Sequence, residues 1–443
     1  MQAKGMKKLS QIMRRKLNEA LGYSGRGYYT GVTGTGDHTI VLRYQKHLIK
    51  AHNGDLFMNI NQGANGGFNT YISTNGGKTW TLSQRHGSYE AILGSVVQDP
   101  QNHDIYVAYA HATTHTGGGA HYQVNVDKLS WSGSAWGSWT SQFGGAALRP
   151  DTSGNTAYTQ CDIAIDSNRV LWVTARYRAD NTPTYYVKVA FKNLVANSGT
   201  WTTLDQIFGT ADSGTEKYGL LIAYGGATKK MGLIMNDNPP TCNLGGLGGP
   251  PYGTYKFWTR NNGGTLDRTT QFSPYGSNGV FQDPSECRLT SYSSHFDADI
   301  DSSGNIWFVW KGDDGGFYCR KHTDGGSWGT SEQVVSSVTN KMDHGSIVAM
   351  PDGSIFFVAT NAWQANNHIH VFQRNANGTW AETADSPIYT GNYVRKVWPA
   401  KSDKSQFLGY YSMIMIWQEN PVNPFKVYFG RKGYTLCSDD HYL

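Results

Sequence analysis

Short runs of apolar and aromatic residues recur along the chain, each bounded by polar turn residues. Runs of this length, rich in β-branched and aromatic residues, are typical of strands rather than helices. The copies are separated by roughly 50 to 75 residues, a period that points to a repeat architecture. They are DLFMNI 55–60, DIYVAY 104–109, VLWVTA 170–175, KMGLIM 230–235, NIWFVW 305–310, SIFFVA 354–359 and SMIMIW 412–417.

Each copy is the centre of a larger unit. A strand-like run that ends in a tight turn, such as the Asp-Ser-Ser-Gly of 301–304, comes before most copies, which predicts a hairpin. A third strand rich in Tyr or Phe follows, as in TYYVKVAF 184–191. A fourth strand opens on a tryptophan in several units: Trp80, Trp136, Trp201, Trp328 and Trp380. Each unit is therefore predicted to be a four-stranded antiparallel sheet.

Repeated four-stranded sheets predict an all-β fold, a seven-bladed β-propeller of four-stranded antiparallel blades. The last unit lacks a fourth strand, whereas the segment 27–44 precedes the first unit and belongs to none. The N-terminal strand is therefore expected to complete the seventh blade, which removes an open sheet edge. The predicted domains are a basic amphipathic helix over residues 1–22 and the propeller over residues 23–443.

The N-terminal helix carries apolar residues on one face and basic residues between them, and Gly22 ends it. It lacks the uninterrupted apolar core of a signal peptide. Three interpretations remain: a cap on the propeller, a helix that docks the chain on a larger assembly, or a segment that binds a membrane surface.

The composition of the chain agrees with a propeller and limits the kinds of ligand that are expected. The chain has 53 glycines and 13% aromatic residues, which suits many short strands joined by tight turns. The net charge of +5 is spread thinly over 443 residues, so nucleic acid is not expected as a ligand. The five cysteines are widely spaced and form no CxxC pair, so they predict no zinc site. No apolar stretch is long enough to span a membrane.

The octamer STNGGKTW, residues 73–80, has the chemistry of a fixed turn. Ser73 and Asn75 can bond turn amides, Gly76 and Gly77 can adopt positive φ, and Trp80 can pack between blades. It resembles the Asp-box, or BNR repeat, with Asn75 where that motif prefers Asp. By this motif the chain resembles the sialidase and ulvan-lyase-like propellers over residues 27–435. The resemblance implies work on glycans, with the Asp-box turns on the face away from the site.

The long connections are predicted to share the opposite face, where strand two runs into strand three and one blade into the next. His111, His115 and His121 bracket a glycine-rich loop there, and Arg176 and Arg178 follow a strand of the third unit. Cleavage of a uronate polysaccharide by β-elimination needs a carboxylate clamp, a base and an acid, for which Arg, His and Tyr are suited.

The residues of this region resemble the arrangement in ulvan-lyase-type propellers: the His that closes IYVAYAH, followed by LWVTARYR and YYVKVAF. The resemblance implies His111 or His115 as base, Tyr158 or Tyr177 as acid, and Arg176 as the carboxylate clamp.

Further residues are candidates for binding rather than chemistry. The predicted substrate-binding residues are His121, Arg178, Trp363, Asn366, His344 and Arg395. Trp363 offers a ring face for stacking on a sugar and Asn366 an amide for its hydroxyls. His344 and His295 begin inner strands. No cofactor is firmly implied, although Asp313 and Asp314 are candidate ligands for a structural Ca²⁺.

The sequence leaves three functions open. The first is binding or cleavage of an acidic polysaccharide at the long-loop face. The second is a non-catalytic virion tail or fibre propeller that recognises a host glycan and docks through residues 1–22. The third is a sialidase-like glycoside hydrolase, for which Arg176, Arg288 and Arg395 would supply the arginines. All three predict a polysaccharide or cell-surface glycan as partner and an extracellular or virion-surface location.

Overall fold

A computed structural model describes most of the predicted strands. The described residues are 28–34, 45–62, 67–86, 92–114, 120–142, 148, 157–178, 185–195, 200–208, 217–225, 230–237, 254–261, 273–274, 295–312, 314–336, 342–361, 368–384, 386–390, 394–401, 406–407, 410–419 and 425–435. The N-terminal segment 1–22, predicted to be a helix, lies outside them.

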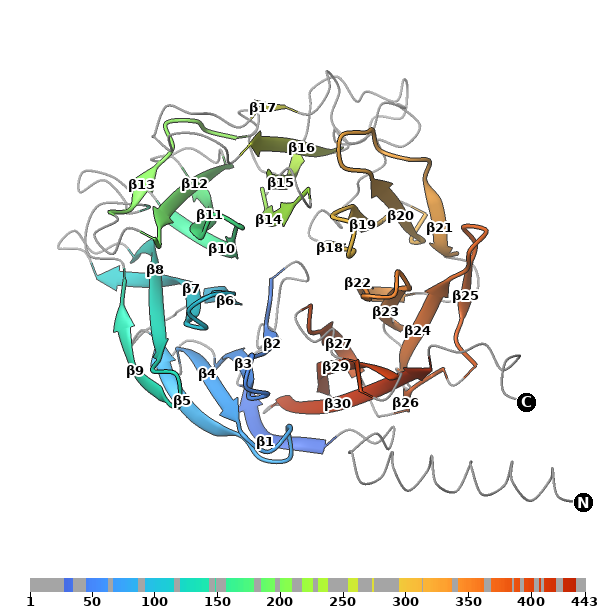
Figure 1. Ribbon diagram of the computed structural model, residues 1–443, viewed down its shortest axis with the longest axis horizontal. Helices are drawn as coiled ribbons and strands as arrows, with labels where there is room; N and C mark the ends of the chain where they lie inside the picture. Colours follow the sequence, from blue (N-terminus) through green and yellow to red (C-terminus); the bar gives the residue numbers. More distant parts are fainter. Residues whose placement is uncertain are drawn as a thin grey trace, which may run out of the picture.

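The described strands form seven antiparallel sheets arranged as a ring (Figure 1), which confirms the seven-bladed propeller. Blade 1 holds β2 (Leu48–Lys50), β3 (Leu56–Asn61), β4 (Phe68–Ser73) and β5 (Thr81–His86). Blade 2 holds β6 (Ile92–Gln98), β7 (Ile105–Thr114), β8 (Ala120–Trp131) and β9 (Trp136–Ser141). Blade 3 holds β10 (Ala157–Ile165), β11 (Val170–Arg178), β12 (Tyr185–Asn193) and β13 (Thr202–Thr203).

The second half of the ring repeats the pattern. Blade 4 holds β14 (Gly219–Tyr224), β15 (Lys230–Asp237), β16 (Thr254–Asn261) and β17 (Ser273–Pro274). Blade 5 holds β18 (Phe296–Ile300), β19 (Ile306–Lys311), β20 (Phe317–His322) and β21 (Glu332–Val335). Blade 6 holds β22 (Met342–Ala349), β23 (Ile355–Asn361), β24 (His368–Arg374) and β25 (Trp380–Glu382), and β26 (Tyr389–Thr390) pairs with β24.

The ends of the chain close the ring as the sequence predicts. Blade 7 holds β27 (Val394–Pro399), β29 (Tyr410–Glu419) and β30 (Phe425–Thr435), and β28 (Gln406–Phe407) pairs with β29. Strand β1 (Tyr28–Gly34) pairs antiparallel with β30 and so completes this blade from the start of the chain. All seven recurring runs are second strands: β3, β7, β11, β15, β19, β23 and β29.

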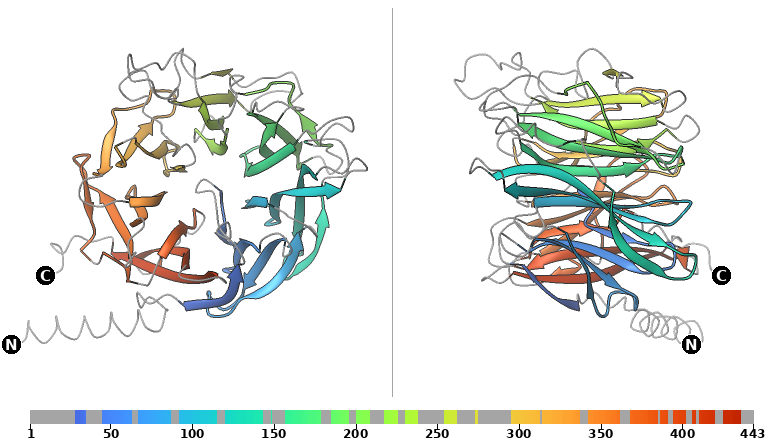
Figure 2. Two further views of the ribbon diagram at one scale, coloured as in Figure 1. Left: turned by 180° about the vertical axis from the view of Figure 1, so that it is seen from behind. Right: turned by 90° about the vertical axis from the view of Figure 1, so that its left-hand side faces the viewer.

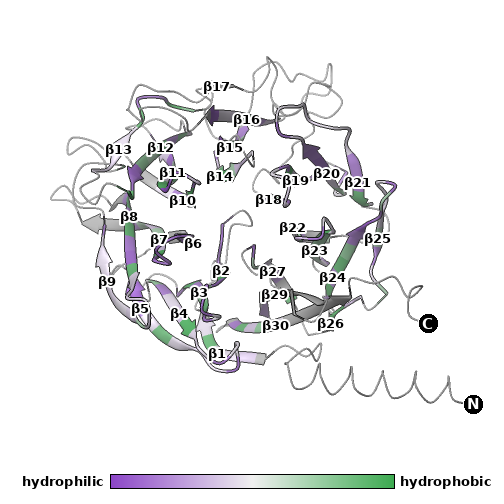
Figure 3. Ribbon diagram, in the orientation of Figure 1, coloured by the Kyte–Doolittle hydropathy of each residue, from purple (hydrophilic) through white to green (hydrophobic). Residues whose placement is uncertain are grey.

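The core is divided into seven apolar clusters, one in each gap between neighbouring blades. The cluster around Val107 and Tyr109 joins blades 1 and 2, for example, and the one around Val173 joins blades 2 and 3. Figure 3 shows hydrophobic and hydrophilic residues alternating along strands such as β4, β8 and β12. Because successive side chains point to opposite faces, a strand that is buried throughout can pack on both neighbouring blades. In β3, Leu56, Met58 and Ile60 pack with blade 7, whereas Phe57 packs with blade 2.

Figure 2 shows the ring from behind and from the side. The ring has two ends. The loop face is the end where second strands run into third strands and blades connect, at Thr114 and Arg178 for example. The turn face is the opposite end, where the short turns 51–55, 99–104 and 132–135 lie. These two names are kept below.

The STNGGKTW turn lies on the turn face of blade 1, between β4 and β5, and has the bonds expected of it. Ser73 Oγ accepts the Gly77 N–H at 2.9 Å, and Asn75 Oδ1 accepts the Thr79 N–H at 3.0 Å. Gly77 has a φ of +92°. The Trp80 ring lies 5.6 Å from that of Phe429 in blade 7, so the turn braces the junction where the ring closes.

Predictions from the sequence also concern cysteine pairs, membrane spans and metal sites. Cys161 and Cys319 are buried as thiols, and Cys242, Cys287 and Cys437 lie outside the described residues. Among the described residues, none belongs to a helix long and apolar enough to cross a membrane. The same part of the chain holds no group of three or more His, Cys, Asp or Glu side chains arranged for a metal ion.

Candidate functional site

The predicted catalytic residues belong to blades 2 and 3, which are neighbours in the ring (Figure 1). His111 and Arg176 are expected in the long connections, and this is wrong: they lie in β7 and β11, and Tyr158 lies in β10. Paired β-branched and aromatic residues extend the ladders, so that Thr113 still pairs with His121. The candidate site is therefore built on strand ends, which hold side chains more rigidly than loops do.

His111 is half-buried near the loop-face end of β7. Burial lowers the pKa of its imidazole, and the negative charge of Asp127 opposes that shift. Its Nδ1 atom is buried and makes no hydrogen bond within the part of the chain that the structure describes. Burial therefore favours the uncharged imidazole, which has one ring nitrogen able to accept a proton.

A buried polar network lies beside His111, between blades 1 and 2. Asp127 Oδ2 is 2.6 Å from His86 Nδ1 and accepts the Tyr109 hydroxyl at 3.1 Å. His86 Nε2 lies 2.8 Å from Thr70 Oγ1, which donates to Asn59 Oδ1 at 2.7 Å. Each of these residues is less than 8% exposed. The Asp127 charge that acts on His111 is thus fixed in place by bonded neighbours.

Arg176 and Arg178 form a cationic pair on β11. The Arg176 Nε–H donates to Thr159 Oγ1 at 2.9 Å, across the ladder to β10. The Cζ atoms of Arg176 and Arg178 lie 4.8 and 6.0 Å from the centre of the Tyr185 ring. The bond to Thr159 and the contact with the Tyr185 ring hold the Arg176 guanidinium in a set direction.

The opposite face of the same sheet carries a third cation and two tyrosines. Lys188 Nζ lies 4.5 Å from the ring centre of Tyr177, and the rings of Tyr177 and Tyr186 are 6.2 Å apart. Burial lowers the pKa of Lys188, which Asp205 opposes. Tyr158 pairs with Tyr177 across the ladder. Blade 3 therefore presents positive charge from both faces near its loop-face end.

Strand alternation directs the predicted residues into three neighbouring gaps. His111 shares a side of β7 with Tyr109, whose ring stacks on Phe68 of blade 1. Tyr177 packs against the core between blades 2 and 3. Arg176 shares a side of β11 with Thr174, which bonds to Gly219 of blade 4. A ligand that used all of these groups would have to lie across the rim rather than within one gap.

Four inner strands carry a bulge at their loop-face ends, in blades 2, 3, 6 and 7. In blade 3 the shift lies between Thr159 and Asp162, and Gln160 has a φ of +52°. In blades 6 and 7 the extra residues are Asp343 and Arg395. Bulges redirect the residues around them and are common beside functional sites. They mark the inner rim of this face as a place where the regular blade geometry is interrupted.

His344 is the one further predicted binding residue whose side chain the structure describes, and it lies apart from this cluster. His344 begins the inner part of β22, is buried, and its ring stacks at 5.6 Å on that of His295 from blade 5. Asp314 accepts the Gly316 N–H and the Tyr318 hydroxyl, as a turn residue would. His115, Arg288, Asp313, Trp363 and Asn366 lie outside the described residues, as do the side chains of His121, Tyr158 and Arg395.

Several residues of the site were not predicted. Tyr185, Tyr186 and Lys188 were read only as part of a third strand, and Asp127 and His86 were not considered. The register pairs Arg178 with Tyr185 and Tyr177 with Tyr186, so alternation in the run TYYVKVAF could have placed the tyrosines beside the arginines. No local signal indicates that Asp127 meets His86, because these residues come from different blades.

Comparison with known proteins gives the same fold. No family model matches the chain, and no curated protein does. Among solved structures, the chain is similar to a PL25 ulvan lyase, with a TM-score of 0.56 and 11% identity over 93% of this chain and 98% of that one. The same kind of lyase bound to a -[GlcA(1-4)Rha3S]- saccharide gives 0.55 at 11% identity, covering 93% of this chain and 98% of that chain. Polysaccharide lyase Uly1 gives 0.51 at 10% identity, covering 94% and 95% of the two chains. At such low identities the likeness establishes the propeller fold.

Proposed function

We propose that the chain is a glycan-directed propeller that binds an acidic polysaccharide across the loop face of blades 2 and 3 and cleaves it by β-elimination. One observation carries the proposal: His111 is a half-buried imidazole, its pKa lowered by burial, at the same rim as two arginines. The solved propellers that resemble this chain include polysaccharide lyases, which is consistent with the same chemistry.

Each role follows from the surroundings of the residue. Arg176 and Arg178 neutralise the uronate carboxylate, which makes the proton on the adjacent C5 more acidic. His111, or His115 beside it in sequence, removes that proton. The electron pair forms the C4–C5 double bond and breaks the bond from C4 to the glycosidic oxygen. Tyr158 or Tyr177 gives a proton to this leaving oxygen.

The experiment is incubation with a panel of acidic polysaccharides, followed by the absorbance of the unsaturated uronate product. The His111→Ala, His115→Ala double variant is expected to lose about 10²- to 10⁴-fold in rate, as for removal of a general base. Arg176→Ala is expected to raise KM as well as lower kcat. Arg85→Ala, which removes an exposed arginine from the outer strand of blade 1, is the matched control and should retain activity.

The outcomes separate cleavage from simple binding. Absence of product from every substrate, together with unchanged glycan binding by the histidine double variant, would contradict the lyase. Binding without product would instead favour the recognition propeller, as on a virion tail or fibre at a host surface. Removal of residues 1–22 tests the docking role proposed for that segment, because assembly with a partner should then be lost.

A further inference from the structure

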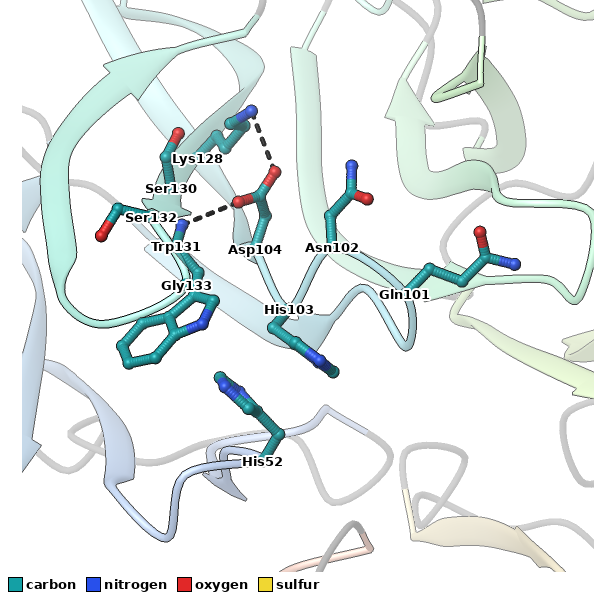
Figure 4. A pocket seen from close by; sticks show the side chains of 10 residues that line it. All are labelled: His52, Gln101, Asn102, His103, Asp104, Lys128, Ser130, Trp131, Ser132 and Gly133. Atoms are coloured by element: carbon teal, nitrogen blue, oxygen red, sulfur yellow. Dashed lines mark hydrogen bonds and ion pairs between the residues drawn. The ribbon is translucent and has the colours of Figure 1, made fainter.

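The turn face carries an open groove between blades 1 and 2, on the end of the ring opposite the proposed lyase site. Its volume is about 670 Å³, within the range of roughly 300–1,000 Å³ typical of ligand sites. Three turns build it, and Figure 4 shows the side chains that line it. The lining residues are His52, Gln101, Asn102, His103, Asp104, Lys128, Ser130, Trp131, Ser132 and Gly133.

One wall of the groove is aromatic. The imidazoles of His52 and His103 stack with their centres 3.8 Å apart, and the Trp131 indole meets His52 edge-on at 4.7 Å. In Figure 4 these three rings lie together, while Gln101 and Asn102 extend away from them. Trp136 packs behind Trp131 at 4.7 Å. A partly exposed indole backed in this way is a rigid apolar surface against which a sugar ring can pack.

Hydrogen bonds hold this wall in one arrangement. The Gln98 carboxamide oxygen accepts the backbone N–H of His52 at 3.0 Å, and its nitrogen donates to the backbone carbonyl of His103 at 2.9 Å. These bonds fix which end of the amide is the nitrogen, which lies 3.0 Å from His52 Nδ1 and donates to it. On the other side, the Asp104 carboxylate accepts the backbone N–H of Trp131 at 2.8 Å. The groove is thus formed before any ligand arrives, which lowers the entropy lost on binding.

The charges of the groove are already balanced. Lys128 Nζ lies 3.0 Å from Asp104 Oδ2. Asp55, near the wall, accepts the Trp136 indole N–H at 2.8 Å. The bond from Gln98 to Nδ1 requires His52 to be the neutral tautomer. Besides these bonded groups, the groove is lined by the partly exposed indole of Trp131, two exposed carboxamides and serine hydroxyls, which suit hydroxyl groups better than they suit anions.

We propose that this groove is a second carbohydrate site, which takes an uncharged, hydroxyl-rich stretch of a glycan chain. The indole of Trp131 stacks on one sugar ring, and Asn102 and Gln101 bond hydroxyls of neighbouring sugars along the chain. A polysaccharide that offers both acidic and neutral stretches can then contact the molecule at two faces. Two linked contacts bind far more tightly than either does alone when one chain can reach both.

The test is electrophoresis of the full chain through native gels that contain arabinan, galactan, xylan or dextran, with polyglucuronate as the acidic polymer. At least one neutral polymer is expected to retard the protein. Trp131→Ala and Asn102→Ala should each weaken that retardation about tenfold, as for loss of a central contact. Arg176→Ala should leave it unchanged, and Ser134→Ala, on the exposed tip of the same turn, is the matched control.

The two faces give separable results. Lack of retardation by every neutral polymer would overturn the groove proposal, and so would retardation that is unchanged in both Trp131→Ala and Asn102→Ala. Because Asn102 is exposed in a turn, its variant should fold even if Trp131→Ala does not. Loss of polyglucuronate binding in Arg176→Ala alone concerns the loop face and leaves the groove result as it stands.

Discussion

The carboxylate of Asp127 connects the buried network between blades 1 and 2 with the electrostatics of His111. It lies 2.6 Å from His86 Nδ1 and raises the pKa of His111 against the effect of burial. Burial and the Asp127 carboxylate also raise the pKa of the Tyr109 phenol, so this hydroxyl stays protonated and donates to Asp127. One side chain therefore stabilises the packing of two blades and adjusts the proposed base.

Asp127→Asn is expected to lower the pKa of His111, because it removes the negative charge that favours the imidazolium. If His111 is the base, the acidic limb of the pH–rate profile should move to lower pH. NMR titration of labelled histidines, with His111 assigned from the spectrum of His111→Gln, measures the shift directly. Tyr109→Phe is the control, because it removes a bond to the same carboxylate and keeps the charge. Equal shifts in the two variants would exclude the charge as the cause.

At the scale of elements, the turn at residues 73–80 shows why a glycine is needed. Gly77 has a φ of +92°, and a Cβ placed on it would overlap the Phe429 ring of blade 7. Gly54, in a turn of blade 1, has a φ of +91° and open space around it. The two positions therefore share the same backbone preference and differ in packing.

Gly77→Ala is expected to destabilise the fold by about 2–4 kcal/mol, since it adds overpacking to the cost of positive φ. Gly54→Ala carries only the backbone cost, about 1–2 kcal/mol. Thermal or urea unfolding of both variants measures the difference, which isolates the contact with Phe429. Equal losses would mean that the ring closure tolerates the extra methyl group.

The elements also show what the sequence could and could not predict. All seven second strands and the closure by β1 follow from patterns in the sequence, because short apolar runs and turn residues are local signals. The bulges at Thr159 and Arg395 do not, because a one-residue shift is decided by pairing with the neighbouring strand. The Asp127–His86 contact and the groove at Trp131 each join two blades, so no stretch of sequence contains either of them.

At the scale of the whole molecule, two lysines cross the centre of the ring. Lys46, just before the inner strand of blade 1, bonds Asp162 of blade 3 at 2.9 Å. Lys401, just after the inner strand of blade 7, pairs with Asp297 of blade 5 and donates to the Ile347 carbonyl of blade 6. Both lysines line a central cavity of about 170 Å³. Non-neighbouring blades are therefore joined directly, in addition to the packing between adjacent blades.

The contacts of Lys401 with Asp297 and Ile347 predict that the stability of the fold depends on pH. Burial raises the pKa of the Asp297 carboxyl, and the Lys401 ammonium opposes that shift. A carboxyl whose pKa is raised by folding stabilises the fold below its unfolded pKa of about 3.9, and this contribution is lost as the pH rises through the folded pKa. Lys401→Met should raise the pKa of Asp297 in the folded state further, because it removes the ammonium that opposes the effect of burial. The free energy of unfolding that Lys401→Met removes should therefore be small near pH 4. It should reach about 3 kcal/mol near pH 7, where the buried Asp297 carboxylate loses its partner.

Urea unfolding at the two pH values measures this difference, and the double variant Lys401→Met, Asp297→Asn identifies its source. Because the second substitution removes the buried charge and keeps an oxygen for the Ile347 N–H, it should restore most of the stability near pH 7. Lys78→Met, at an exposed position, controls for loss of a lysine as such. A cost for Lys401→Met that is the same at both pH values, and that Asp297→Asn does not relieve, would show that the lysine acts by packing rather than by its charge.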